Sequence, residues 1–123
     1  MTNNKLLKTG EGWRIGWDAD AAIYQGLVGG EDWAFELTGE EMQDFCRLLQ
    51  QLAETMEQMT AELMAEERIA CEAESELLWL EVEGFPDAYE LRLILHSGRR
   101  CEGNWPSSVV PELLQGARSL QIF

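Results

Sequence analysis

The sequence TGEEMQDFCRLLQQLAETMEQMTAELM, residues 38–64, decides the fold because it encodes one long helix. Thr38 and Glu41 have the spacing of a capping box, in which a hydroxyl and a carboxylate satisfy the first free N–H groups of a helix. Apolar residues then recur at alternating spacings of three and four, the period of one helix face. These residues are Met42, Phe45, Leu49, Leu52, Met56, Met59 and Leu63, with Leu48 and Met64 widening the stripe. The pattern predicts an amphipathic helix that ends near residue 68.

A helix of this length is longer than one small sheet can cover. At about 1.5 Å per residue it spans about 45 Å, whereas a typical strand spans about 20 Å. Part of the apolar stripe must therefore pack on something else, either a second sheet of the same chain or a second subunit. The residues available for a subunit contact are those toward the helix end, Met56, Met59, Leu63 and Met64.

Short strands are predicted on both sides of this helix. Before it, the alternation of Trp13, Ile15 and Trp17 indicates a half-buried strand over residues 12–17. Two further strands, 22–28 and 33–37, meet at a glycine turn. After the helix, strands are expected at 69–72, 77–83, 89–96 and 99–103, followed by a short helix that Ser108 caps and in which Pro111 is tolerated. We expect residues 1–10 to be a flexible arm and residues 11–123 to form one α+β domain.

The two halves of the domain, residues 12–68 and 69–123, resemble each other. Sliding the chain by 68 residues places Leu37 on Trp105 and Met42 on Val110, and upstream it places Ile23 on Leu91. Matching turns, apolar positions and helix starts indicate a duplicated unit of antiparallel strands followed by a helix. The expected architecture is two packed antiparallel sheets of three or four strands, with one long and one short helix.

Charge is unevenly distributed along the chain. The 123 residues include 23 acidic and 9 basic side chains, a net charge of −14. Residues 31–90 hold 18 acidic residues and two arginines, so that the two ends together are slightly basic. Such a field keeps a protein soluble and repels polyanions, so nucleic acid is a possible but disfavoured partner. No window approaches the ~18 apolar residues of a membrane span, and the first residues do not resemble a signal peptide, so we expect a cytoplasmic protein.

The tryptophans and arginines are the candidates for contact with nucleic acid or another ligand. Exposed aromatic rings on a sheet can stack on single-stranded bases, and nearby cations can contact the phosphates. The candidates are Trp13, Arg14, Arg92, Arg99 and Arg100. The alternatives are that the tryptophans pack in the core and that Arg92 pairs across strands with Glu81 or Glu83.

The sequence gives little indication of catalysis, and we predict that the protein is not an enzyme. His96 is the only histidine, and a two-residue turn at 97–98 would bring Cys101 onto the same sheet face as a nucleophile. The cysteines are three, widely separated and expected to be reduced. Glu72, Glu74 and Glu76 alternate like a cation site, but a solvated edge is the simpler interpretation. We therefore predict no metal and no cofactor.

Four segments give the chain a family resemblance. They are residues 12–18 (GWRIGWD), 27–33 (LVGGEDW), 78–84 (LWLEVEG) and 102–106 (EGNWP). The chain resembles a small cyanobacterial protein family of unknown function whose fold is similar to the Whirly group of single-stranded DNA-binding transcriptional regulators. The resemblance implies two packed sheets with helices, and it assigns no activity. Whirly proteins carry a lysine-rich motif on an early strand, and the corresponding residues 23–28 contain neither lysine nor arginine.

Taken together, these patterns favour a non-catalytic binding or regulatory domain that acts through protein contacts, with a homo-oligomer as the expected state. Single-stranded nucleic-acid binding is the first alternative, and an unrecognised enzyme is the second. Fold similarity alone does not decide between them.

Overall fold

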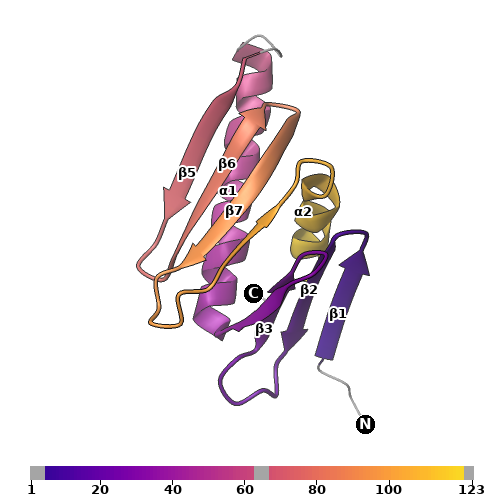
Figure 1. Ribbon diagram of the computed structural model, residues 1–123, viewed down its shortest axis with the longest axis vertical. Helices are drawn as coiled ribbons and strands as arrows, with labels where there is room; N and C mark the ends of the chain where they lie inside the picture. Colours follow the sequence, from indigo (N-terminus) through magenta and orange to yellow (C-terminus); the bar gives the residue numbers. More distant parts are fainter. Residues whose placement is uncertain (1–4, 63–66, 121–123) are drawn as a thin grey trace.

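The computed structural model describes residues 5–62 and 67–120, which fold as two consecutive β-β-β-β-α units (Figure 1). The first unit contains β1 (Lys5–Gly10), β2 (Trp13–Asp18), β3 (Gly26–Gly29), β4 (Ala34–Leu37) and α1 (Gly39–Glu62). The second contains β5 (Ile69–Glu74), β6 (Leu78–Phe85), β7 (Ala88–Leu95), β8 (Glu102–Trp105) and α2 (Val110–Ser119). No helix in these ranges is long and apolar enough to cross a membrane.

Each unit contributes one antiparallel sheet in which the strands lie in chain order. Sheet A has the order β1-β2-β3-β4, and sheet B has the order β5-β6-β7-β8. Successive strands are joined by short turns, so each sheet is a meander built from local hairpins. The predicted fold class, two antiparallel sheets with one long and one short helix, is confirmed.

The two helices are exchanged between the sheets. α1 follows sheet A in the chain but packs mainly on β5 and β6 of sheet B, while α2 follows sheet B and packs mainly on β1 and β2 of sheet A. Figure 1 shows α1 running along the strands of sheet B for most of its length. The apolar stripe is therefore covered by the second sheet of the same chain as far as Met56, which agrees with the first of the two possibilities for this part of the helix.

The core lies where the inner faces of both sheets meet the two helices. Its fully buried side chains come from every layer and include Ile15, Phe45, Leu80, Leu93 and Trp105. Inward and outward residues alternate along the strands, as in β6, where residues 78, 80, 82 and 84 are buried. Burial on one face of each sheet fixes the register of its strands.

The internal repeat has two different offsets. β4 and β8 correspond at the predicted 68 residues, but β1, β2 and β3 correspond to β5, β6 and β7 at 65. The difference arises because Gly29 pairs with Ala34 across four residues, whereas Ile94 pairs with Glu102 across seven. The second unit thus has a longer turn between its last two strands.

This register corrects one predicted match. Gly26, rather than Ile23, is equivalent to Leu91, because Gly26 pairs with Leu37 and Leu91 pairs with Trp105. Ile23 lies outside the strands and is 62% exposed. Residues 19–25 form a loop in which the side-chain amide of Gln25 bonds to the backbone of residues 21 and 39. The strand predicted for residues 22–28 therefore begins at residue 26, four residues later than expected.

Four further expectations about element boundaries are wrong. Residues 5–10 are not a loose arm, because β1 pairs with the whole length of β2. The long helix does not reach residue 68, since residues 67 and 68 are already outside it, directly before β5 turns back along α1. α2 begins after Val109 without a side-chain cap, so Ser108 is not its N-cap. The last strand of sheet B lies at 102–105 instead of 99–103 because residues 96–101 form the longer turn.

Candidate functional site

The start of α1 carries the predicted capping box. The Glu41 N–H donates to Thr38 Oγ1 at 3.2 Å, and the Thr38 N–H donates to Glu41 Oε1 at 2.8 Å. Gln25 adds a further cap, because its side-chain oxygen accepts from the Gly39 N–H at 2.9 Å. Glu41 is 3% exposed, so this carboxylate is buried at the positive end of the helix.

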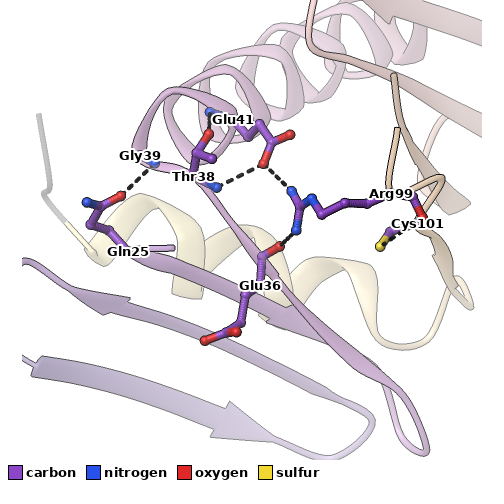
Figure 2. A network of polar contacts seen from close by, with 7 residues as sticks. All are labelled: Gln25, Glu36, Thr38, Gly39, Glu41, Arg99 and Cys101. Carbon is purple, nitrogen blue, oxygen red and sulfur yellow. Dashed lines mark hydrogen bonds and ion pairs between the residues drawn. The ribbon is translucent and has the colours of Figure 1, made fainter. Parts of the chain in front are cut away.

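Arg99 reaches this buried carboxylate from the other unit. Figure 2 shows its guanidinium between the turn before β8 and the junction of β4 with α1. It donates to Glu41 Oε1 and to the backbone oxygen of Glu36, and it lies 4.6 Å from the centre of the Tyr24 ring. A buried carboxylate needs a partner, and Arg99 provides it for Glu41. Arg99 therefore links the two repeats and is not a free cation for a ligand.

The other predicted ligand contacts are distributed over separate parts of the molecule. Trp13 is buried beneath α2, where its indole N–H donates to Glu112 at 3.0 Å. Arg14 is on the outer face of sheet A, with its aliphatic part across Gly29. Arg100 is exposed in the turn before β8. These side chains do not converge on one site.

Arg92 belongs to the outer face of sheet B and is paired there. Its guanidinium lies 4.0 Å from Glu81, the residue directly opposite on β6, and 5.6 Å from the centre of the Trp79 ring. The cross-strand pairing that the sequence suggested for Arg92 is therefore confirmed. Trp79 itself donates to Glu72 at 3.2 Å, so this half-exposed tryptophan is also engaged within the sheet.

The predicted nucleophile and base do not meet. His96 Nε2 lies 2.7 Å from Glu74 Oε2, whereas the Cys101 thiol donates to the backbone oxygen of Arg99 at 3.8 Å. The two residues are separated because residues 96–101 form a wide turn, where the sequence suggested a two-residue turn. Among the described residues, no three acidic, histidine or cysteine side chains gather as metal ligands.

Of the four predicted oligomer contacts, Met56 and Met59 lie within the described residues. Met56 is fully buried in the core between α1 and sheet B, so it is not available to a second subunit. Met59 is half-buried. Leu63 and Met64 lie outside the described residues.

The outer face of sheet B is strongly acidic. Its side chains include six glutamates, Glu72, Glu74, Glu81, Glu83, Glu90 and Glu102. Two pairs of them, Glu72 with Glu81 and Glu83 with Glu90, are direct cross-strand neighbours. Like charges in this position destabilise a sheet, and they repel any polyanion that approaches it.

The outer face of sheet A has a different character. Its central cross-strand row is Leu7, Gly16, Leu27 and Glu36, and the next row is Thr9, Arg14, Gly29 and Ala34. Leu7 is 60% exposed, and a hollow of about 340 Å³ lies against Leu7, Gly16 and Leu27. In the described structure both helices pack on the inner faces of the sheets, so neither helix covers this apolar surface, on which Lys5 and Arg14 are balanced by Asp18 and Glu36.

Sequence reasoning missed this surface because it placed residues 1–10 in an arm. Leu6 and Leu7 stand next to each other, so they show no alternation that would indicate a strand. The available signal was the internal repeat, because an offset of 65 residues would have required a strand equivalent to β5 ahead of residue 12.

A groove of about 820 Å³ runs between α1 and α2 at the pseudo-twofold axis that relates the repeats. The equivalent residues Gln50 and Arg118 bond to each other across it at 2.7 Å. Cys46 and its equivalent Leu114 line the groove. Burial raises the pKa of the Cys46 thiol to about 12, so at neutral pH it is protonated and unreactive.

These features define an acidic α+β domain in which two duplicated units exchange their helices and only one sheet leaves an apolar outer face. Residues 8–120 match the family described as a domain of unknown function, DUF1818, and the chain belongs to this family. The resemblance to a family of unknown function is thus confirmed, without an assigned activity.

One solved structure is closely similar over almost the whole chain. It is a crystal structure of a protein with unknown function from the DUF155 family of Prochlorococcus sp. NATL2A, a cyanobacterium. The TM-score is 0.88 at 31% sequence identity, over 94% of this chain and 97% of that chain. The curated proteins contain no match to the chain.

Proposed function

We propose that the protein is a non-catalytic binding domain that acts through protein contacts and uses the outer face of sheet A as its binding surface. The observation that carries this proposal is the contrast between the two outer faces. Sheet B is covered with carboxylates, whereas sheet A presents Leu7 and Leu27 around a glycine hollow. Exposed apolar surface with a polar rim is characteristic of protein interaction sites.

The shape of the central outer row of sheet A makes this face suitable for binding a protein. A hollow of about 340 Å³ lies against Leu7 and Leu27, and the loop before β3 borders it. The space directly over Gly16 is narrow, since a Cβ there would lie 3.2 Å from Leu6 O and 3.3 Å from Leu7 Cδ1. An apolar side chain of a partner can enter the hollow and be desolvated there. Asp18 and Glu36 line the hollow and can give polar contacts that orient the partner.

A pair of matched substitutions tests the proposal. Leu27→Lys places a charge at the centre of the outer face of sheet A, and Ile94→Lys places the same charge on the outer face of sheet B. Immobilised wild type and both variants are exposed to a cyanobacterial lysate, each captured protein is purified, and its binding is measured by calorimetry. We expect Leu27→Lys to weaken binding at least about tenfold, which is ~1.4 kcal/mol, and Ile94→Lys to leave it unchanged. Equal binding by wild type and Leu27→Lys would reject this surface.

Single-stranded nucleic-acid binding, the role that a Whirly-like fold implies, is the alternative. Of the five predicted contacts, Arg14 and Arg100 are the ones whose side chains form no hydrogen bond or ion pair within residues 5–62 and 67–120, and they lie on different elements. Protein binding predicts that oligonucleotides leave tryptophan fluorescence unchanged at about 50 mM salt, where phosphate contacts are strongest. Quenching that weakens steeply as salt rises would favour the alternative instead.

A further inference from the structure

The four edge strands of the two sheets are protected to different degrees. β4 and β8 have four residues each, and Arg99 covers the Glu36 carbonyl of β4 while the Trp33 ring packs against Gly103 of β8. β5 has six residues and carries Glu72 and Glu74. Short strands, covering groups and charges are the usual protection of a sheet edge against pairing with another strand.

β1 is the least protected of these edges in the described structure, since Lys5 and Lys8 are its only charges. It has six residues, contains no proline and no acidic residue, and pairs with β2 along its whole length without a bulge. Leu6 is 44% exposed and Leu7 is 60% exposed. Because neighbouring strand residues point to opposite faces, a leucine stands open on each side of this edge.

We propose that β1 pairs antiparallel with β1 of a second copy of this chain, so that the two A sheets join into one eight-stranded sheet. The proposal deepens the proposed function, on which it rests, by naming one partner of sheet A. An antiparallel pair of identical strands is related by a twofold axis, which gives a closed dimer and leaves no further edge of this kind.

The sequence of β1 is self-complementary in one register. Residues directly opposite each other must lie on the same face of the joined sheet, which allows Leu7 to face Leu7 of the second copy. Leu6 then faces Lys8, whose methylene stem covers it while the ammonium stays in water. Lys5 faces Thr9. In this register no lysine lies directly opposite another lysine.

Charge favours this edge over β5 for contact between two copies. Every copy carries a net charge of −14, and pairing β5 with itself would bring the glutamates of two copies together. β1 has two lysines and no carboxylate, and the acidic face of sheet B belongs to the other sheet. The second copy is therefore best accommodated where the molecule is least acidic. Added salt screens the remaining repulsion, so the dimer is expected to tighten as salt rises.

The association state is measured by light scattering and sedimentation at about 50 µM protein, a concentration that populates dimers with micromolar dissociation constants. We expect wild type to have twice the 14.0 kDa mass of one chain and Leu7→Lys to have the single mass. Ile23→Lys, which charges another exposed apolar side chain away from β1, should leave the dimer intact. Circular dichroism confirms that each variant is folded.

A disulfide experiment tests the register. With Leu7→Cys the two new thiols face each other across the axis at the spacing of a direct cross-strand pair, about 4.5–5.5 Å between Cα atoms, which a disulfide can span, so mild oxidation gives a covalent dimer. Thr9→Cys, on the same face but opposite Lys5, should give none above the level of wild type, which has the same native cysteines. Equal cross-linking at both positions would overturn the register.

The outcomes separate this proposal from the proposed function. A folded wild type that stays monomeric, or a dimer that Leu7→Lys leaves intact, overturns the pairing of β1. If Leu27→Lys still abolishes binding of a captured protein in that case, the outer face of sheet A keeps its role. A foreign extended segment that binds to a monomeric wild type and is displaced by Leu7→Lys would show that β1 accepts another chain instead of its own copy.

Discussion

Sheet A and sheet B are two versions of the same meander, and they differ mainly on the side that faces solvent. Their inner rows are both apolar, for example Leu6, Trp17, Gly26 and Leu37 against Cys71, Val82, Leu91 and Trp105. Their outer rows at the same level are Leu7, Gly16, Leu27 and Glu36 against Glu72, Glu81, Arg92 and Asn104. The duplicated fold needs only the inner rows, so the outer rows were free to diverge, and one sheet has a largely apolar outer row where the other has a charged one.

The inner rows also show how two unequal copies still fill one core. Where sheet A has the large Phe35, sheet B has Gly103, and the ring of Trp33 packs onto that glycine. Trp33 also contacts the rings of Phe35 and Trp105 at 5.5 and 5.0 Å. Differences of volume at equivalent positions are therefore balanced across the pseudo-twofold axis.

Replacing Trp105 should cause the largest loss of stability among the predicted changes, and Leu37 at the equivalent inner position provides the comparison. Trp105→Ala creates a cavity and removes the indole N–H that donates to the Gly29 carbonyl at 2.8 Å. We expect a loss of about 4 kcal/mol in the free energy of unfolding, against about 3 kcal/mol for Leu37→Ala at the equivalent position. Urea denaturation measures both. A smaller loss for Trp105→Ala than for Leu37→Ala would contradict the central place of the tryptophan.

The next largest loss of stability is expected from the pair of Arg99 and Glu41, which links the two repeats. Arg99→Ala leaves the Glu41 carboxylate buried with only its helix contacts, and because Arg99 is itself 28% exposed, we expect a loss of about 2 kcal/mol, less than for a fully buried pair. Glu41→Gln combined with Arg99→Ala should recover part of it, since no buried charge remains unpaired. Additive losses in this double-mutant cycle, measured by urea denaturation, would show that the two side chains do not interact.

The buried Cys46 thiol in the groove between the helices predicts that the protein loses stability at alkaline pH. The folded-state pKa of Cys46 is raised from 9.0 to about 12, so the thiol is protonated in both states below pH 9. Above pH 9 the unfolded chain loses this proton first, and stability falls as pH rises toward 12. By pH 10 the loss attributable to Cys46 is about 1 kcal/mol. Unfolding of wild type and Cys46→Ala at pH 7 and pH 10 measures it, and an equal pH effect in both proteins would refute the assignment.

The sequence was sufficient for the parts of this fold that follow from local periodicity. The capping box of Thr38 and Glu41 and the stripe of α1 were both identified because each depends on residues three or four positions apart. Periodicity shows that a face is buried but not what buries it, so the exchange of helices was not predictable. The role of Arg99 was missed for a similar reason, since its partner Glu41 lies 58 residues away. β1 was missed because its two leucines are adjacent in the sequence and give no alternating pattern.

The smallest predicted effect concerns the acidic outer row. Glu83 and Glu90 are direct cross-strand neighbours on β6 and β7, and Arg68 bonds to Glu83 from the side at 3.0 Å. Glu90→Lys replaces a like-charge pair with an opposite-charge pair, so we expect a gain of about 0.5 kcal/mol that shrinks at high salt. Thermal unfolding at low and high salt measures this gain. Glu36→Lys on sheet A, which has Leu27 as its cross-strand neighbour, is the control and should not show this gain.

A gain from Glu90→Lys would mean that sheet B retains its charge at a cost in stability, which is expected if that face serves to keep other molecules away. No gain, or a gain independent of salt, would remove the electrostatic difference between the two sheets as an explanation of why binding is assigned to sheet A.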